Sequence, residues 1–434
     1  MKKWILLFLL LPNLAWGVTY TIGPGQTYTT FTLLVATETL APDDIVDGGG
    51  NTFTETWTPD GSGTSGHPIT LRNAIIDATG LTYGINVAIY EYFAISNIEV
   101  KNANDYGIRL RRANGSTVTG CTIHNIGTAG DDWPCEGIMV DASSNCTISG
   151  NTIYEIGRHG IQLIGQNTYA TSSNVVANNT IYNCYHTGID VDNSGTAGSG
   201  TVVGNIIRYN NIYANANYAN FLISMNGIYV EGNAADLLVD NTEIYYNVIH
   251  DVPGKGIQLQ YYVTDALIYN NTIANRNASY ATDCAGLEVD DTGSSGIIVK
   301  NNIVTGYDNA SAVAIVILSA TASPAANVDY NMWYVDGAHK VVAIGASDYH
   351  QDDQALYKAA GYDVNAPTWA DPLLASATNF HLQAASPCKN TGTSVGLTRD
   401  KDGIPIVGAV DIGAFEYFGG HLGTGITLIG GSLP

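Results

Sequence analysis

Gly137-Ile138-Met139-Val140-Asp141 is one copy of a pentapeptide that recurs along the chain. Its other copies are Gly84-Ile85-Asn86-Val87-Ala88, Gly107-Ile108-Arg109-Leu110-Arg111, Gly160-Ile161-Gln162-Leu163-Ile164, Gly188-Ile189-Asp190-Val191-Asp192, Gly227-Ile228-Tyr229-Val230-Glu231, Gly256-Ile257-Gln258-Leu259-Gln260 and Gly286-Leu287-Glu288-Val289-Asp290. Successive glycines lie between 23 and 39 residues apart. A motif that returns at such a period predicts a solenoid, in which each repeat stacks on the next.

The pattern inside each repeat indicates strands. Apolar and polar residues alternate after the glycine, which is the period of a strand, and the repeat region shows no helical stripe. Equivalent strands would then stack in parallel from coil to coil, with the right-handed winding that parallel connections favour. The sequence therefore predicts an all-β protein: a single-stranded, right-handed parallel β-helix with a small capping extension at its C-terminal end.

A second motif, Asn-x-Ile, lies between the pentapeptides. Its asparagine column is Asn151, Asn179, Asn210, Asn247, Asn271, Asn301 and Asn331, with Ser96 and Cys121 in two earlier coils. We expect these amides to point inward at a turn and to hydrogen-bond one another along the stack. The glycine of each pentapeptide is expected at a tight bend, where a Cβ atom would clash or φ must be unusual.

The charge of the chain restricts its partners. The formal net charge is −22, from 17 Lys and Arg against 39 Asp and Glu. Such a surface repels nucleic acid and anionic membranes, so neither is an expected partner. It also repels acidic polysaccharides unless a cation or a local basic cluster intervenes. No later segment is long and apolar enough to span a membrane, so no insertion is expected.

The N-terminus has the features of a secretory signal peptide. Lys2 and Lys3 precede an apolar run from Trp4 to Leu11, and Ala15-Trp16-Gly17 supplies small residues at the cleavage positions. We therefore expect residues 1–17 to be removed near Gly17 and the mature protein to be secreted or periplasmic. Export permits disulfides among the six cysteines, but their pairing is open and several can equally be buried thiols.

Further motifs resemble a known family. They include Ile22-Gly23-Pro24-Gly25 near the start and Gly66-His67-Pro68-Ile69 before the first full coil. Three more lie near the end: Phe380-His381-Leu382-Gln383, Asp400-Lys401-Asp402-Gly403 and Asp411-Ile412-Gly413-Ala414-Phe415-Glu416-Tyr417. Together with the repeats, they resemble the secreted pectate-lyase-like superfamily of parallel β-helix proteins, in its bacterial type. The resemblance implies the fold more than the reaction, because that superfamily includes lyases, hydrolases, epimerases and non-catalytic spikes.

The same motifs suggest how the chain is organised. We expect an N-terminal cap and first coils at 18–82, β-helix repeats at 83–335 and a C-terminal capping region at 336–418. Good helix formers from Asp352 to Gly361 predict a short helix in this cap, which would cover the exposed strand edges of the last coil. Residues 419–434 form a Gly-rich tail.

The polar residues of the pentapeptides should form columns on the outside of one sheet. In each copy the Ile and Val point inward and the two alternate residues point outward. The first column is Arg109, Met139, Gln162, Asp190, Tyr229, Gln258 and Glu288, and the second is Arg111, Asp141, Ile164, Asp192, Glu231, Gln260 and Asp290. Because parallel strands lie about 4.8 Å apart, Asp192 and Glu231 should be neighbours.

A polysaccharide lyase is the first functional hypothesis. A lyase needs a base, often Lys or Arg in β-helix lyases, that takes the proton next to a uronate carboxylate, and a cation that neutralises this carboxylate. Arg109, Arg158 and Lys255 are candidates for these roles. A calcium ion could supply the positive charge, and its candidate ligands are Asp190, Asp192 and Glu231.

A glycoside hydrolase is the alternative enzyme, because it needs two carboxylates. Asp192 with Glu231 suits the separation of about 5 Å found in retaining enzymes, and Asp141 with Asp192 suits the wider inverting arrangement. Across both hypotheses the candidate catalytic residues are Arg158, His159, Lys255, Asp141, Asp192 and Glu231. The candidate substrate-binding residues are Arg109, Arg111, Trp133, Gln162, His186, Tyr229, Gln258 and Tyr261.

A non-catalytic protein is the third hypothesis. In that case the acidic columns are only the solvated side of a solenoid that binds glycans or other surfaces. A polysaccharide is the expected partner in both enzyme hypotheses and in the glycan-binding form of the third, and none of the three requires an organic cofactor.

Overall fold

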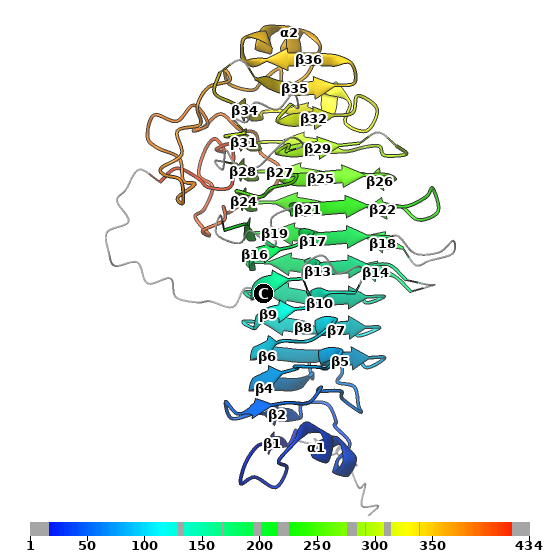
Figure 1. Ribbon diagram of the computed structural model, residues 1–434. Coiled ribbons are helices and arrows are strands. Elements are labelled where there is room, and N and C mark those ends of the chain that lie inside the picture. Colours follow the sequence, from blue (N-terminus) through cyan, green and yellow to red (C-terminus); the bar gives the residue numbers. More distant parts are fainter. Residues whose placement is uncertain are drawn as a thin grey trace, which may run out of the picture.

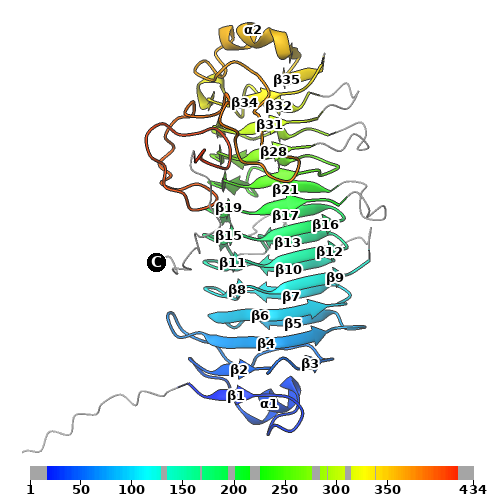
Figure 2. The same ribbon diagram turned by 90° about the vertical axis from the view of Figure 1, so that its left-hand side faces the viewer.

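Stacked coils form an elongated solenoid in the computed structural model, with the N-terminal coils at one end and helix α2 at the other (Figures 1 and 2). The structure describes residues 17–128, 134–166, 169–193, 201–215, 225–275, 284–290, 292–307, 314–337 and 339–418. Nearly every regular element is a short strand, and almost every pair of neighbouring strands is parallel. The predicted parallel β-helix is therefore confirmed.

One eleven-stranded sheet contains the pentapeptides. Its strands are β5 (Tyr83–Ala88), β7 (Tyr106–Arg111), β10 (Glu136–Asp141), β13 (His159–Ile164), β17 (Thr187–Asp192), β21 (Asn226–Glu231), β25 (Ile257–Gln260), β29 (Leu287–Val289), β32 (Val316–Leu318), β35 (Lys340–Ile344) and β36 (Ser347–His350). Only the last pair, β35 with β36, is antiparallel. This reversal ends the stack of coils, and the sheet faces the viewer in Figure 1.

The rest of each coil belongs to a second large sheet with two ladders of short strands. Ladder A contains β8 (Thr117–Thr119), β11 (Thr147–Ser149), β15 (Val175–Ala177), β19 (Ile206–Arg208), β23 (Glu243–Tyr245), β27 (Leu267–Tyr269), β30 (Ile298–Lys300) and β33 (Val328–Asp329). Ladder B contains β9 (Thr122–Ile126), β12 (Thr152–Ile156), β16 (Thr180–Cys184), β20 (Asn211–Tyr213), β24 (Val248–His250), β28 (Thr272–Ala274), β31 (Ile303–Thr305) and β34 (Met332–Tyr334).

The N-terminal coils join the two ladders. Their strands are β1 (Thr19–Thr21), β2 (Ile45–Asp47), β3 (Thr52–Phe53), β4 (Ile69–Asp77) and β6 (Phe93–Lys101), and the long β6 pairs with both β8 and β9. Helix α1 (Phe31–Thr37) packs at this end, and the hydroxyl of Thr30 caps its first turn. A small four-stranded sheet stands beside the pentapeptide strands, formed by β14 (Thr171–Ser172), β18 (Val202–Val203), β22 (Val239–Asp240) and β26 (Val263–Thr264).

The core of the solenoid is filled by the apolar residues of the repeats. Ile138 and Val140 of β10 are fully buried, as are their equivalents in neighbouring coils. The glycines permit close packing: a Cβ atom on Gly137 would lie 2.5 Å from the main-chain oxygen of Gly160. None of the pentapeptide glycines needs a positive φ, so lack of space explains the glycine column and unusual backbone geometry does not.

An amide ladder runs through the turn before ladder B. Each asparagine donates from Nδ2 to the Oδ1 of the next at about 3 Å, in the order Asn151, Asn179, Asn210, Asn247, Asn271, Asn302 and Asn331. The predicted member Asn301 is wrong, because its left-handed backbone (φ 57°) turns its side chain outward to the main-chain oxygen of Thr393. Ser96 is wrong as well, since it pairs with Thr119 in the strand before the turn. Cys121 is confirmed, because its N–H bonds to Asn151.

A buried aspartate ends this ladder. Asp363 accepts from Asn331 Nδ2 at 2.9 Å, from Trp333 Nε1 at 2.8 Å and from the Tyr357 hydroxyl at 3.1 Å. Burial raises the pKa of Asp363 to about 6, although these donors favour the carboxylate. Asp363 therefore connects the last asparagine to the residues that cover the C-terminal coil.

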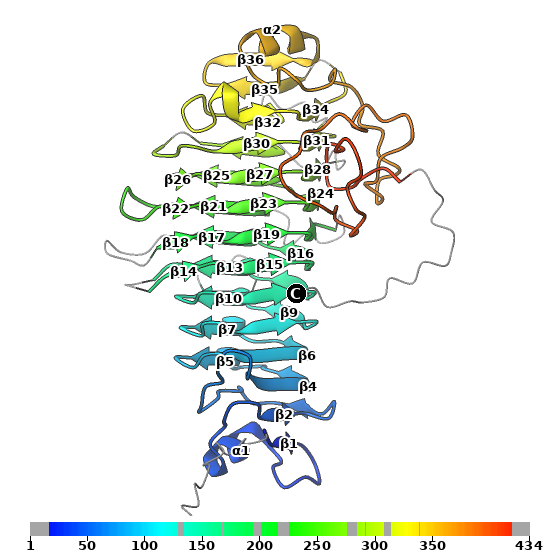
Figure 3. The same cartoon turned by 180° about the vertical axis from the view of Figure 1, so that it is seen from behind.

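The C-terminal region has two parts. The 3-10 turn η2 (Gln351–Asp353) and helix α2 (Gln354–Ala359) lie at the end of the solenoid, and α2 falls within the segment expected to be helical. Another 3-10 turn, η1 (Ala325–Asn327), precedes β33 in the last coil. The chain then turns back along the flank beside β24, β28 and β31 (Figures 1 and 3). There Leu374, Phe380, Leu382, Ile412 and Phe415 form a second apolar cluster with side chains of the solenoid. We call residues 371–418 the flank segment.

Other expectations are only partly covered by the described residues. All six cysteines are buried free thiols, so the structure favours the thiol alternative over disulfides. No helix among the described residues is long and apolar enough to cross a bilayer. The expected signal peptide and the Gly-rich tail lie outside the described residues, apart from Gly17 and Val18 near the expected cleavage point.

Candidate functional site

The outward columns of the eleven-stranded sheet lie in the predicted register. Asp190 pairs with Gln162 on one side and Tyr229 on the other, and Asp192 pairs with Glu231. A third column, one residue before the glycines, aligns Tyr106, Glu136, His159, Thr187 and Asn226. The structure therefore brings the candidate residues of five successive coils onto one face.

This face differs from an ordinary solvated strand surface. All six residues of β10, β13 and β17 are buried, including those that point outward. Glu136 and Asp141 are 0 % exposed, and Asp190 is 2 % exposed. On β7 and β21, by contrast, the outward side chains of Arg109, Arg111, Tyr229 and Glu231 are partly accessible. The face therefore has a closed middle and an accessible region on each side.

The accessible region on the N-terminal side is cationic. Arg109 Nη2 donates to Asp141 Oδ2 at 2.9 Å, and Arg111 Nε lies 3.4 Å from the same oxygen. The Arg109 guanidinium also lies over the stacked rings of Tyr83 and Tyr106, 5.8 and 5.3 Å from their centres. Burial opposes the charge of Arg109, but Asp141 outweighs this effect and raises the pKa of the guanidinium. The shared acceptor Asp141 thus fixes both arginine side chains in place.

The closed middle contains a histidine pair next to an acid. The rings of His159 and His186 meet edge to face at 5.1 Å, and His186 Nδ1 lies 3.2 Å from the Thr187 hydroxyl. Burial lowers the pKa of both histidines, and the charge of Arg158 lowers them further. Both rings are therefore neutral at physiological pH, so each could accept a proton only at low pH.

Glu136 is the most strongly buried acid beside this pair. Its Oε1 accepts from Arg158 Nη1 at 3.3 Å. Burial raises the pKa of Glu136 to about 7, although the charge of Arg158 lowers it. Glu136 is not among the site residues selected from the sequence, because an outward acid on a strand is ordinarily solvated.

Asp190 is held by an amide and has an acidic neighbour. Gln162 Nε2 donates to Asp190 Oδ2 at 2.8 Å, and His159 Nε2 lies 3.8 Å from the same oxygen. Burial raises the pKa of Asp190 well above its ordinary value, and the nearby charge of Asp192 adds to this effect. Asp190 is therefore a carboxyl group that holds its proton far longer than a solvated aspartate.

Several polar atoms of this face make no hydrogen bond to any described residue. They are Glu136 Oε2, Asp141 Oδ1, His159 Nδ1 and Gln162 Oε1. A buried polar atom without a partner costs about 1–3 kcal/mol, so such atoms are rare in stable folds. Their concentration on the two adjacent strands β10 and β13 is the structural signal that this face serves chemistry or binding.

The accessible region on the C-terminal side consists of amides, a tyrosine and an acid. The Tyr229 hydroxyl donates to Gln260 Oε1 at 2.7 Å, and Asn226 Nδ2 donates to Gln258 Oε1 at 3.2 Å. Glu231 is half-buried here. Burial raises its pKa first, and the charge of Asp192 raises it further. Glu231 is therefore accessible to a ligand, and it keeps its proton to a higher pH than an ordinary glutamate does.

The remaining predicted residues lie at the edges of this region. Lys255 is nearly buried, and its Nζ forms an ion pair with Glu288 Oε2 at 3.0 Å. Tyr261 follows β25 and is 37 % exposed, which suits a stacking platform for a sugar ring. Trp133, the other aromatic candidate, lies outside the described residues.

The predicted calcium ligands do not fit a metal ion as arranged. Among the described residues, no three His, Cys, Asp or Glu side chains converge on one point. Asp190 Oδ2 already accepts a hydrogen bond from Gln162 Nε2, so this oxygen is less available as a calcium ligand. No step of the chemistry below therefore uses a metal, and the calcium site stays a prediction.

Comparison with known proteins identifies the family. A family model described as "Right handed beta helix region" matches residues 61–235 and 136–328, which together cover more than half of the chain. The chain therefore belongs to the right-handed β-helix family. A search of curated protein sequences finds no match.

Solved structures share the fold at low identity. A pectate lyase, Pel9A, is 18 % identical with a TM-score of 0.56, and the match covers 92 % of this chain and 96 % of that one. A GH136 lacto-N-biosidase from Eubacterium ramulus is 12 % identical with a TM-score of 0.50, covering 75 % of this chain and 67 % of that one. At these identities the likeness concerns the fold alone.

Proposed function

We propose that this chain is a secreted carbohydrate-active enzyme that hydrolyses a glycosidic bond with Glu231 and Asp192. The observation that carries the proposal is their position: these two acids are direct partners on adjacent parallel strands, where the closed middle of the face meets its accessible region. One acid is accessible and has a raised pKa, which suits a proton donor. The polar columns beside them would bind the rest of the sugar chain.

The proposed mechanism uses the two carboxyl groups in different roles. Protonated Glu231 donates its proton to the oxygen of the scissile glycosidic bond, and the C1–O bond breaks. Asp192 attacks C1 and forms a glycosyl ester, which water then hydrolyses while Glu231 takes the proton of that water. Adjacent parallel strands place the Cα atoms of the two residues about 4.8 Å apart, so their carboxyl groups can adopt the short separation that retaining enzymes use.

The geometry favours hydrolysis over β-elimination, the other enzymatic hypothesis. A lyase needs a base that can lose its proton, and the candidate bases are held in ion pairs: Arg158 with Glu136, Lys255 with Glu288, and Arg109 with Asp141. In each pair the cationic group is occupied by an acidic side chain and does not point freely toward a substrate. The cations are therefore better suited to holding acidic side chains, or an acidic sugar, than to abstracting a proton.

Both kinds of glycan chemistry occur among the proteins of similar fold. One is a pectate lyase and the other a lacto-N-biosidase. This likeness supports a glycan as the substrate class for this chain without choosing the bond that is cleaved. The carboxyl pair of Asp192 and Glu231 is the feature that favours hydrolysis over β-elimination.

Purified mature protein should be incubated with a panel of neutral and acidic polysaccharides, with and without a chelator. We expect new reducing ends without ultraviolet absorbance from an unsaturated sugar, and no effect of the chelator. Ultraviolet absorbance on a uronate polymer would instead establish a lyase. Absence of any product across the panel, from folded protein, would support the non-catalytic hypothesis.

A further inference from the structure

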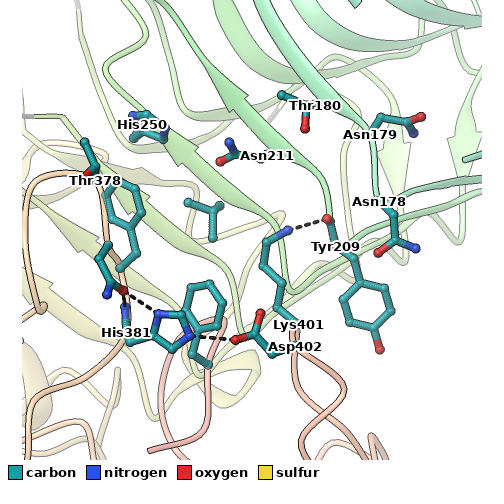
Figure 4. A pocket seen from close by; sticks show the side chains of 14 residues that line it. Asn178, Asn179, Thr180, Tyr209, Asn211, His250, Thr378, His381, Lys401 and Asp402 are labelled. Atoms are coloured by element: carbon teal, nitrogen blue, oxygen red, sulfur yellow. Dashed lines mark hydrogen bonds and ion pairs between the residues drawn. The ribbon is translucent and has the colours of Figure 1, made fainter. Parts of the chain in front are cut away.

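A second cleft lies on the flank, away from the proposed carboxylate pair. It encloses about 610 Å³ between ladder B and the flank segment (Figure 4). Thr180 and Asn211, at the starts of β16 and β20, contribute its solenoid side. Residues 378–381 and Lys401 with Asp402 contribute the opposite side. We call this cleft the flank pocket.

The flank segment holds its side of the pocket rigidly. His381 is fixed between Asn379 Oδ1 at 2.5 Å and Asp402 Oδ2 at 2.7 Å, and its ring stacks on Phe415 at 4.0 Å. The Lys401 ammonium donates to main-chain oxygens of Tyr209 and Asn210 in the solenoid. The two sides of the pocket are thus joined directly, and the cleft is preformed.

The solenoid side offers polar groups that are not engaged within the protein. In the part of the chain that the structure describes, the side chains of Asn178, Thr180 and Asn211 form no hydrogen bond, although all three line the pocket. An amide supplies both donors and an acceptor, and a hydroxyl supplies one of each kind. The pocket therefore presents a mixed set of donors and acceptors.

The charges of the pocket nearly cancel. Lys401 and Asp402 are adjacent and opposite in sign, and His381 is paired with Asp402. The rings of Phe380 and Phe415 add apolar edges to the lining. A neutral ligand with many hydroxyl groups and some apolar C–H surface matches this composition, whereas a strongly charged ligand does not.

We infer that the flank pocket is a binding site for a neutral saccharide unit. Its volume lies within the range of small-ligand pockets and is sufficient for one or two sugar rings. The site is built from ladder B and the flank segment, whereas Asp192 and Glu231 belong to the eleven-stranded sheet. The inference therefore does not depend on the proposed function and can fail or succeed separately.

Saccharide binding can be measured by saturation-transfer NMR and calorimetry on the full chain carrying Glu231→Gln, which prevents cleavage of the probes if that residue is catalytic. The probes are cellobiose, lactose and N,N′-diacetylchitobiose, with digalacturonate as the acidic comparison. We expect at least one neutral disaccharide to bind. Removing one hydrogen bond by Thr180→Val or Asn211→Ala should weaken that binding about threefold to tenfold.

Two controls belong to the same column of ladder B. Thr152 pairs with Thr180 one coil earlier but does not line the pocket, so Thr152→Val should leave binding unchanged. Thr180→Ser keeps the hydroxyl and should keep most of the affinity. The inference is overturned if none of the neutral disaccharides binds, if digalacturonate binds more tightly than all of them, or if Thr180→Val and Asn211→Ala leave the affinity unchanged.

Discussion

The outward side chains of ladder B and those of the eleven-stranded sheet belong to the same coils but differ in kind. On ladder B, the rings of His124, Tyr154, Tyr182, Tyr213 and His250 stack with centres 4.8–5.1 Å apart, which follows the rise of the coils. On β10, β13 and β17, the same rise brings acids, histidines and amides together in burial, with several polar atoms unpaired among the described residues. The first arrangement stabilises the solenoid at low cost, and the second costs stability.

This difference shows which face serves function. A solenoid can fill its outward positions with stacked rings, so nothing in the fold requires buried carboxyl groups on the other sheet. Groups that destabilise the fold and still occupy adjacent coils are best explained by chemistry or binding. Substitutions on the two faces should therefore differ in what they change, activity on one face and stability alone on the other.

Asp192→Asn should abolish most of the proposed hydrolysis. The amide cannot act as a nucleophile, so we expect release of reducing ends to fall about 10³-fold or more while the melting temperature stays close to the wild-type value. Initial rates on the best substrate of the panel provide the measurement. A variant that keeps a tenth of the wild-type rate would remove Asp192 from the mechanism.

Asp141→Asn should lower stability more than any change in the aromatic stack. Asp141 is the shared acceptor of Arg109 and Arg111, and its side chain is fully buried. Breaking a buried ion pair leaves charge without a partner, and we expect a loss of about 3 kcal/mol in unfolding free energy. Urea denaturation followed by circular dichroism tests this value. An unchanged midpoint would mean that the pair contributes nothing net.

Glu136→Gln should change how stability depends on pH. Burial raises the pKa of Glu136 in the folded protein from 4.5 to about 7, so the folded state binds more protons than the unfolded state between these values. Its contribution to stability is therefore present below pH 4.5 and is lost as pH rises through about 7. The variant lacks this loss of stability, so it should gain about 3 kcal/mol in unfolding free energy relative to wild type as the pH rises from 4.5 to 8. If the unfolding free energies of wild type and variant changed in parallel with pH, the raised pKa of Glu136 would be contradicted.

Tyr182→Leu should have the smallest effect. The ring stacks between Tyr154 and Tyr213 at 4.9 and 5.1 Å, and such contacts are worth about 1 kcal/mol beyond the area that they bury. We expect a loss of about that size, with hydrolysis unchanged because the ring lies on ladder B. If the variant lost activity under conditions in which it is fully folded, the aromatic stack on ladder B would influence the proposed active site on the other sheet.

The repeat made much of this structure predictable. The alternation after each glycine specifies which residues face outward, and the stacking of coils specifies which of them are neighbours, as for Asp192 and Glu231. The choice of Asn301 over Asn302 failed because Asn301-Asn302-Ile303 matches Asn-x-Ile literally. The strand register instead aligns Asn302-Ile303-Val304 with Asn271-Thr272-Ile273, so Asn302 is the residue that joins the ladder.

The alternation of apolar and polar residues in the repeats does not predict burial of outward positions or contacts between distant segments. A strand sequence identifies an outward position but does not show whether that position is covered, so Glu136 was not recognised as a buried acid with a raised pKa. The flank pocket depends on contacts between distant segments: Lys401 and its acceptor Tyr209 are 192 residues apart in the chain. No local signal in either segment indicates that they meet.

The most direct test of the central claim compares Glu231→Gln with Glu243→Gln. Both glutamates are partly accessible and belong to the same coil, but Glu231 lies on β21 of the eleven-stranded sheet and Glu243 lies on β23 of ladder A. Reducing-end release should fall at least about 10²-fold in the first variant, because the proton donor is lost, and stay at the wild-type rate in the second. Equal rates for the two variants would contradict the assignment of this face as the active site.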